Sequence, residues 1–327
     1  MISKEMRAFL ASFSSSAEKK SPATVAEERA GLDAFMAPLK VPEGVIREDL
    51  ELGGRPARRC LPTGARPDRA ILLFHGGGYR VGSLAGYNSF MSYLAVACGA
   101  PVYGLDYRLA PEHCYPAALD DAVSAFIDLS QMIAPERIML VGDSAGGGLA
   151  LACLQTLKEQ GWPGSGAAAL LSPWLDGTAS GESYGTRRSE FQSAMQSYAG
   201  NYPLDTVGFS PLFGDHSGLP PLLIQVAQDE PMRDDSTQLQ ARAVAAGVAR
   251  RASEGPRVRQ HLEGAAAGRH RRAGGGEVTR KCGPGSHDTE QVLGQCGLHF
   301  SQALIVRVRR THTLVCARAS LRRKPNP

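Results

Sequence analysis

Short apolar runs alternate with longer helix-like segments over the first 248 residues of the chain. Each run is nearly continuous in apolar character, which is typical of parallel strands buried on both faces. The clearest helical patterns between the runs cover residues 116–130 and 145–160, and the second ends at a glycine, a common C-terminal stop. This alternation predicts an α/β fold with a mostly parallel central sheet flanked by helices. The expected strands are residues 70–74, 101–107, 138–142, 167–172 and 221–227.

Two polar segments do not fit this sheet. Residues 1–45 precede the first strong strand signals, and residues 174–210 are rich in Gly, Ser and Tyr and lie between two expected strands. We expect both to form a lid over one edge of the sheet. Beyond residue 249 the periodicity fades, and only residues 303–308, "ALIVRV", have a strand-like pattern.

The composition fits one large α/β domain with an additional piece. The chain has 327 residues, of which 43% are hydrophobic, enough for a sizeable core. It has no apolar run of about 18 residues and no apolar signal region at its start, so we expect a cytoplasmic protein without a membrane span. The cysteines show no close pairing, which favours reduced thiols. They are Cys60, Cys98, Cys114, Cys153, Cys282, Cys296 and Cys316.

The charge changes sign along the chain. Residues 249–327 carry 16 Lys and Arg against 5 Asp and Glu, whereas the preceding part carries 20 basic and 27 acidic residues. The basic segment raises the question of nucleic-acid binding, but it lacks interleaved aromatic residues and any recognised module. We therefore expect no nucleic-acid partner.

The stretch "GDSAG", residues 142–146, follows an expected strand and precedes an expected helix. The G-x-S-x-G pattern in this context is typical of a nucleophile elbow, a tight turn that lifts a serine Oγ above the sheet edge. The alternative is a phosphate-binding turn, but no Walker-type lysine follows and the glycine order of a dinucleotide-binding motif is absent. We expect Ser144 to be a nucleophile.

A second glycine-rich stretch, "HGGGYR", follows the strand expected at residues 70–74. Consecutive glycines let backbone N–H groups converge on one point, as the oxyanion of an acyl-transfer reaction requires. The alternative is a plain flexible loop. We assign the oxyanion hole to the N–H groups of Gly76, Gly77 and Ala145, and we expect His75 to support the loop rather than to act as a base.

Carboxylates cluster directly after the strand expected at residues 221–227. This is the carboxyl end of a parallel strand, where doubly wound folds place their sites. A triad acid follows the serine and precedes the histidine in chain order. We expect Asp234 and Asp235 to be solvated residues that cap the next helix. Asp229 and Glu230 remain as candidates for the acid.

Together these stretches resemble the bacterial hormone-sensitive lipase family of α/β-hydrolases over about residues 45–248. The resemblance implies an α/β-hydrolase fold, a helical cap and a Ser–Asp/Glu–His triad. The family's acid opens the pattern acid–x–apolar–x–Asp, which implies Glu230, with Asp229 in reserve. The stretches that carry the resemblance are "HGGGYR" (75–80), "DYRLAPEHCYPAALDDA" (106–122), "GDSAGGGLA" (142–150), "LSPWLD" (171–176), "GLPPLLIQV" (218–226) and "DEPMRDDS" (229–236).

The resemblance also implies a division of the chain into a core and a cap. The expected parts are residues 1–45 as the first part of the cap, 46–173 as the first part of the core, 174–210 as the cap insertion, 211–248 as the second part of the core, and 249–327 as an atypical basic tail.

The histidine of the triad is the least clear member. The resemblance implies a last strand after the acid and then an apolar approach to the histidine, and the chain departs from that pattern after residue 248. His261 lies 31 residues after Glu230, but its neighbours differ from those of the family. We assign His261 as the base, with coincidence as the alternative reading. His270, amid arginines and glycines, has the pattern of an exposed residue.

A reading-frame shift near residue 249 is one hypothesis for the departure. The loss of periodicity and the change of charge occur at the same place. Sequencing the 3′ end of the gene tests it, since an intact frame with no family-like alternative frame would remove the hypothesis.

The sequence thus predicts a carboxylic ester hydrolase that acts on short- to medium-chain acyl esters through an acyl-enzyme on Ser144. The alternative is a hydrolase-fold protein that binds a small molecule without turnover, because its histidine is missing or misplaced. We expect a small-molecule ester as substrate and no metal or cofactor. The pattern leaves open whether the chain forms a homodimer.

Overall fold

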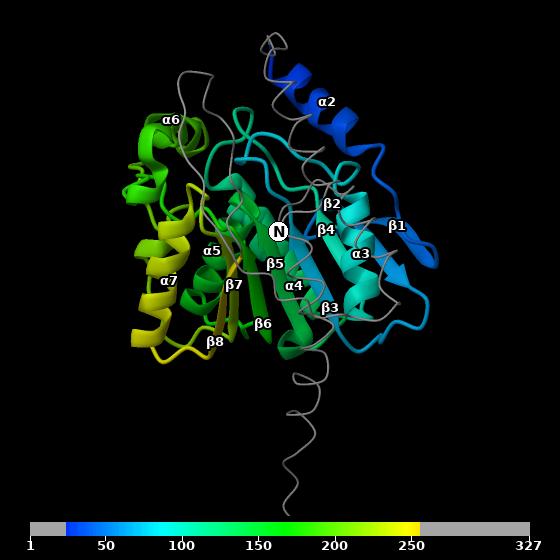
Figure 1. The fold of residues 1–327 in the computed structure, drawn as a ribbon. Coiled ribbons are helices and arrows are strands. Elements are labelled where there is room, and N and C mark those ends of the chain that lie inside the picture. Colours follow the sequence, from blue (N-terminus) through cyan, green and yellow to red (C-terminus); the bar gives the residue numbers. More distant parts are fainter. Residues whose placement is uncertain (1–23, 256–327) are drawn as a thin grey trace, which may run out of the picture.

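The computed structural model describes residues 24–255, which form one sheet with helices on both faces and above one edge (Figure 1). The sheet has eight strands in the order β1-β2-β4-β3-β5-β6-β7-β8. β2 is antiparallel to β1 and β4, and the other pairs are parallel. The strands are β1 (Val45–Leu52), β2 (Arg55–Pro62), β3 (Ala70–Phe74), β4 (Val102–Leu105), β5 (Ile138–Asp143), β6 (Ala167–Leu171), β7 (Leu222–Ala227) and β8 (Arg250–Gly255).

The expected strands are all present, as β3 to β7, and the expectation of a mostly parallel sheet is confirmed. Alternate side chains of these strands enter two separate core clusters, because successive residues of a strand point to opposite faces. Leu72 and Leu140 belong to one cluster, and Leu73 and Val141 to the other. Since both faces are buried, these strands lack a polar side, which explains their continuous apolar pattern.

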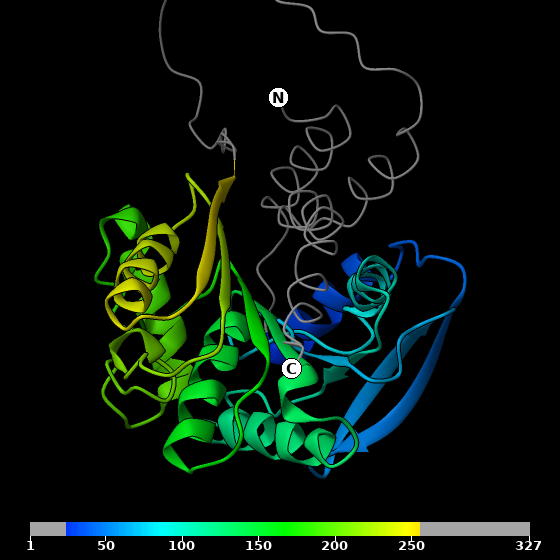
Figure 2. The ribbon, with the colours of Figure 1, turned by 90° about the horizontal axis from the view of Figure 1, so that it is seen from below.

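Helices cover both faces of the sheet (Figure 2). α4, α5 and α7 contribute to the cluster on one face, and α3 contributes to the cluster on the other. The helices are α2 (Val25–Met36), α3 (Asn88–Cys98), α4 (Ala117–Ser130), α5 (Ala145–Glu159), α6 (Arg188–Ala199) and α7 (Arg233–Ala245), and the short 3₁₀ turns are Pro135–Arg137, Glu182–Arg187 and Pro211–Phe213.

The hairpin of β1 and β2 was not predicted by the hydrophobic pattern. Its sequence is rich in charge, and most of β1 is exposed or half-buried, as expected for a strand at the sheet edge. Arg58 and Asp49 face each other across the hairpin and form an ion pair of 2.5 Å. Gly53 makes the turn with φ of 58°, and a Cβ there would lie 2.5 Å from the backbone of α4. The turn therefore requires glycine.

The sheet continues past residue 248, where the sequence analysis ended the core. β8 pairs in parallel with β7, with Arg250 opposite Leu222 and Gly255 opposite Ala227. Its sequence "RRASEG" has no apolar pattern, and its backbone pairing with β7 identifies it as a strand. The core boundary at residue 248 was thus placed too early. Residues 256–327, including the strand-like stretch 303–308, lie outside the described residues.

α2 and α6 lie above the carboxyl ends of the strands, where the lid was expected (Figure 1). α2 begins with a capping box: the Thr24 hydroxyl accepts the Glu27 N–H at 3.2 Å, and the Glu27 carboxylate accepts the Thr24 N–H at 3.0 Å. These bonds satisfy two donors that a helix start otherwise leaves open. Residues 1–23 of the expected lid lie outside the described part of the chain.

Across residues 24–255, none of the helices combines the length and the apolar character needed to cross a bilayer. The cysteines in this range form no disulfide. They are Cys60, Cys98, Cys114 and Cys153.

Candidate active site

Ser144 stands at the sharp turn between β5 and α5, with φ of 52° and ψ of −119°. A non-glycine residue in this region is strained, as a nucleophile elbow requires. The glycines beside it make the turn possible. A Cβ at Gly142 would lie 2.1 Å from the Gly146 carbonyl oxygen, and one at Gly146 would lie 2.0 Å from the Phe74 carbonyl oxygen. Ser144 is partly exposed, whereas both of its neighbours are buried.

Backbone hydrogen bonds to the neighbouring strand and its loop fix the elbow. The Ser144 N–H donates to the carbonyl of Leu171, the last residue of β6, at 2.9 Å. The Ser144 carbonyl accepts the N–H groups of Gly147 at 3.0 Å and Trp174 at 2.9 Å. The structure therefore places the expected nucleophile at the carboxyl edge of the sheet and at the N-terminus of α5, whose dipole favours negative charge.

The oxyanion loop, residues 76–81, follows β3. The Gly77 carbonyl accepts the N–H groups of Arg80 and Val81 at 3.0 Å each, which closes a tight turn. A Cβ at Gly77 would lie 2.1 Å from the Val81 carbonyl oxygen, so only glycine fits there. Within residues 24–255, the N–H groups of Gly77, Gly78 and Ala145 donate no hydrogen bond and remain available.

The assignment of Gly76 to the oxyanion hole was wrong. Its N–H donates to Asp143 Oδ1 and to the Tyr87 hydroxyl, both at 2.9 Å, so it is not free to bind an oxyanion. The Tyr87 hydroxyl donates to Asp143 Oδ2 at 2.8 Å and closes the triangle. We call Asp143, Tyr87 and the Gly76 N–H the buried hold. Gly78, which the sequence analysis did not select although it is in the same glycine run, has a free N–H instead.

Burial shapes the electrostatics of the buried hold. Loss of water raises the pKa of Asp143 to about 6, and the hydrogen bonds from Tyr87 and Gly76 oppose that rise. The carboxylate directly precedes the nucleophile, so it ties the elbow to the first residue of the oxyanion loop.

His75 supports the loop from inside the core, as expected. Its ring is buried and stacks on Tyr107 with ring centroids 4.3 Å apart. The Tyr107 hydroxyl donates to the His75 carbonyl at 2.6 Å. Burial lowers the pKa of His75 to about 4, so its ring is neutral at pH 7.

Of the two candidate acids, Glu230 is the one held at the sheet edge. The Ser172 hydroxyl donates to its carboxylate, and Ser172 directly follows Leu171, which holds the elbow. Burial raises the pKa of Glu230 to about 7, and the Ser172 bond partly opposes the rise. Among the side chains of residues 24–249, no cation pairs with this carboxylate. Asp229 is exposed.

The expectation that Asp234 and Asp235 are solvated was wrong for Asp235. Its side chain is fully buried and accepts the N–H groups of Leu175 at 2.9 Å and Asp176 at 3.1 Å, and the hydroxyl of Tyr184 at 2.8 Å. Burial raises the pKa of Asp235 to about 7. It therefore anchors α7 to the insertion after β6, a tertiary role that the sequence pattern did not reveal. Asp234 is half-buried and accepts a backbone N–H of the same insertion.

His261, the expected base, lies outside the described residues. Within residues 24–255 the histidines are His75, His113 and His216, and no hydrogen bond joins any of them to the side chains of Ser144 or Glu230. The described residues thus bring together the expected nucleophile Ser144, the free N–H groups of Gly77, Gly78 and Ala145, and the candidate acid Glu230. The same residues contain no group of three or more His, Cys, Asp or Glu side chains arranged to hold a metal ion.

Comparisons with known proteins agree with this geometry. A family model for the alpha/beta hydrolase fold matches residues 71–259, more than half of the chain. An acetyl-hydrolase of Streptomyces hygroscopicus is 42% identical over 56% of this chain and 65% of its own length. The chain thus matches slightly less than two thirds of that relative. Carboxylesterase NlhH of Mycobacterium tuberculosis is 30% identical over 62% of this chain and 69% of its own length.

Solved structures show the same likeness. An esterase from the bacterial hormone-sensitive lipase family superposes with a TM-score of 0.80 at 31% identity, covering 95% of this chain and 98% of that one. A hormone-sensitive lipase from a metagenome library superposes with a TM-score of 0.73 at 37% identity, covering 77% of this chain and 88% of that one. This chain belongs to the bacterial hormone-sensitive lipase family of α/β-hydrolases.

Proposed function

We propose that the chain is a carboxylic ester hydrolase that uses Ser144 as its nucleophile. The observation that carries this proposal is the strained elbow of Ser144 beside three free backbone donors, those of Gly77, Gly78 and Ala145. Names of relatives support it, because they include an acetyl-hydrolase, an esterase and a carboxylesterase.

The reaction follows from the roles of these groups. Ser144 Oγ attacks the ester carbonyl carbon, and a base takes its proton. The carbonyl oxygen becomes an oxyanion that accepts the N–H groups of Gly77, Gly78 and Ala145. Collapse of the tetrahedral intermediate expels the alcohol, which takes the proton back from the base. Water then hydrolyses the acyl-enzyme by the same steps.

We propose Glu230 as the acid and His261 as the base. A half-buried carboxylate with a raised pKa and no cationic partner among the side chains of residues 24–249 is suited to receive an imidazolium. Gly255 lies opposite Ala227, three residues before Glu230, so the described chain ends next to the acid. His261 follows six residues later, a span of at most about 20 Å when extended.

The proposed substrates are uncharged esters with short to medium acyl chains. The name of the acetyl-hydrolase relative supports a short acyl group. The cap helices α2 and α6 above the strand ends support a limit on its length.

Hydrolysis of p-nitrophenyl acetate and p-nitrophenyl octanoate by the full chain tests the proposal. We expect turnover of both, with the acetate preferred. Ser144→Ala and His261→Ala each lower kcat by about 10⁶, and Glu230→Gln lowers it by about 10⁴. Asp229→Asn serves as the matched control for Glu230 and leaves kcat within about twofold.

The variants separate the parts of the proposal. Turnover that survives Ser144→Ala would contradict the assignment of Ser144 as the nucleophile. Turnover that survives His261→Ala would contradict only the assignment of His261 as the base. An inactive wild-type chain would instead favour a protein that binds small molecules without turnover.

We also propose a cytoplasmic location, supported by the absence of a disulfide among the cysteines of residues 24–255. Cell fractionation tests it, and recovery outside the cytoplasm would contradict it. The homodimer stays an open prediction that size-exclusion chromatography with light scattering decides.

A further inference from the structure

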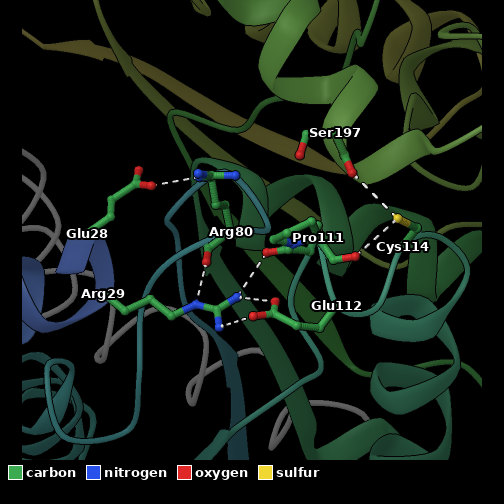
Figure 3. A network of polar contacts seen from close by, with 8 residues as sticks. Glu28, Arg29, Arg80, Pro111, Glu112, Cys114 and Ser197 are labelled. Atoms are coloured by element: carbon green, nitrogen blue, oxygen red, sulfur yellow. Dashed lines mark hydrogen bonds and ion pairs between the residues drawn. The ribbon is translucent and has the colours of Figure 1, made fainter. Parts of the chain in front are cut away.

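The cap helix α2 contacts two loops through one arginine (Figure 3). Arg29 Nε donates to the carbonyl of Arg80 at 2.9 Å, and Arg29 Nη2 donates to the carbonyl of Ala110 at 2.9 Å. The same guanidinium forms a two-pronged ion pair with Glu112, at 2.7 and 3.0 Å. Arg80 belongs to the oxyanion loop, and Ala110 and Glu112 belong to the loop after β4. We call Arg29 with these three partners the cap clamp.

Two further bonds close the cap clamp. The Arg80 side chain forms an ion pair of 2.7 Å with Glu28, the neighbour of Arg29 on α2 (Figure 3). The Ala110 N–H donates to the Tyr79 carbonyl at 2.8 Å, so the two loops are also joined directly. The helix and the two loops therefore hold one another at a single place.

The held atom is close to the oxyanion donors along the chain. The held Arg80 carbonyl shares its peptide group with the N–H of Val81, which donates to the Gly77 carbonyl at 3.0 Å, so this peptide is part of the turn that presents the free N–H groups of Gly77 and Gly78. Gly77 and Gly78 have φ of 119° and 62° and carry no side chains that could fix them. Such a turn depends on hydrogen bonds from other segments of the chain to keep its N–H groups pointing at the reacting carbonyl.

We propose that Arg29 is a positioning residue, whose forked guanidinium fixes the end of the oxyanion loop and so aims the N–H groups of Gly77 and Gly78 at the reacting carbonyl. This inference rests on the proposed ester hydrolysis for its kinetic effect. The proposed role depends on the forked hydrogen bonds of Arg29 rather than on its charge. The side chains of Arg29 and Glu112 are 29% and 51% exposed, and ion pairs at such exposed positions contribute little to stability.

The kinetic test compares four variants of the full chain on p-nitrophenyl acetate. Arg29→Gln removes the fork, and we expect kcat to fall about tenfold with KM within about twofold, because oxyanion binding acts mainly on the transition state. Arg29→Lys keeps the charge but not the fork, and should stay closer to Arg29→Gln than to the wild type. Glu112→Gln keeps both carbonyl bonds and should stay within about twofold of the wild type.

Arg187→Gln is the matched control. Arg187 is the N-cap residue of the cap helix α6 and also forms an ion pair, with Glu190 at 2.8 Å, but none of its hydrogen bonds goes to the oxyanion loop. We expect it to keep the wild-type kcat. A wild-type kcat in Arg29→Gln, or full rescue by Arg29→Lys, would overturn the proposal.

Hydrogen–deuterium exchange provides a readout that does not need turnover. In Arg29→Gln the amides of residues 75–83 should exchange at least about fivefold faster than in the wild type, while Arg187→Gln leaves them unchanged. Unchanged exchange in Arg29→Gln would overturn the positioning role even if the chain is inactive. An inactive wild type with faster exchange in Arg29→Gln would contradict the ester hydrolase and leave the loop-holding role supported.

Discussion

The oxyanion loop is held at its start and at its end by two arrangements of opposite character. At the start, the buried hold engages the Gly76 N–H with a carboxylate and a hydroxyl that are almost free of solvent. At the end, the cap clamp engages the Arg80 carbonyl with a half-exposed arginine on α2. In a dry environment each lost bond leaves an uncompensated polar group, whereas at the surface water replaces it. The start of the loop should therefore be rigid and the end adjustable.

The largest expected effect comes from removing the carboxylate of the buried hold. Asp143→Ala leaves the Gly76 N–H with only the Tyr87 hydroxyl and opens space beside the elbow, so we expect kcat on p-nitrophenyl acetate to fall about 100-fold or more. Asp143→Asn keeps one acceptor oxygen and should lose less. Equal kcat in the wild type, Asp143→Ala and Asp143→Asn would show that the buried hold does not position the oxyanion loop.

Loss of the hydroxyl in the same place should matter less. Tyr87→Phe removes one acceptor of the Gly76 N–H and one donor to Asp143 but keeps the ring, and we expect kcat to fall about tenfold. Tyr202→Phe, at an exposed tyrosine after α6, is the control and should match the wild type. A fall that appears in KM alone would contradict a role in aiming the loop.

Salt should distinguish the two arrangements. Raising NaCl from about 0.05 to 1 M screens the exposed pairs of the cap clamp, and we expect kcat of the wild type to fall about twofold. Arg29→Gln keeps only the Arg80–Glu28 pair and should show a weaker salt dependence. If Arg29→Gln and the wild type respond alike, the salt effect arises elsewhere.

The smallest effect concerns stability against pH. The pKa of Asp143 is raised in the folded state to about 6 from 3.8, so the folded protein holds this proton more tightly than the unfolded chain. Its contribution to stability is therefore highest below pH 3.8 and falls as pH rises towards 6. The Tm of the wild type minus that of Asp143→Asn should decrease over this window, by a few degrees, and then level off. A constant difference from pH 4 to 7, measured by calorimetry, would argue against a raised pKa.

The sequence predicted the parts of the molecule whose structure depends on local pattern. Strands buried on both faces have continuous apolar runs, and the turn around Ser144 needs small residues at fixed positions, so β3 to β7 and the sharp turn at Ser144 were both predicted. The β1–β2 hairpin and β8 were missed because edge strands carry polar side chains and owe their place to backbone pairing.

The errors at the site have a tertiary cause. Three consecutive glycines are equivalent in a motif, and only the reach of Asp143 from another strand decides that Gly76 is occupied while Gly77 and Gly78 are free. Asp235 has the pattern of an exposed helix cap, and its burial depends on an insertion that lies about 50 residues earlier in the chain. The cap clamp likewise joins residues far apart in sequence, so no local pattern marks Arg29.

Covalent labelling with a fluorophosphonate tests the central claim most directly, because this reagent traps an activated serine whose oxyanion donors are in place. The account predicts one equivalent of label on the full chain, located by peptide mass spectrometry on Ser144. It also predicts no label in Ser144→Ala and slower labelling in Asp143→Ala and Arg29→Gln. Label on another serine, or equal labelling of Ser144→Ala and the wild type, would contradict it.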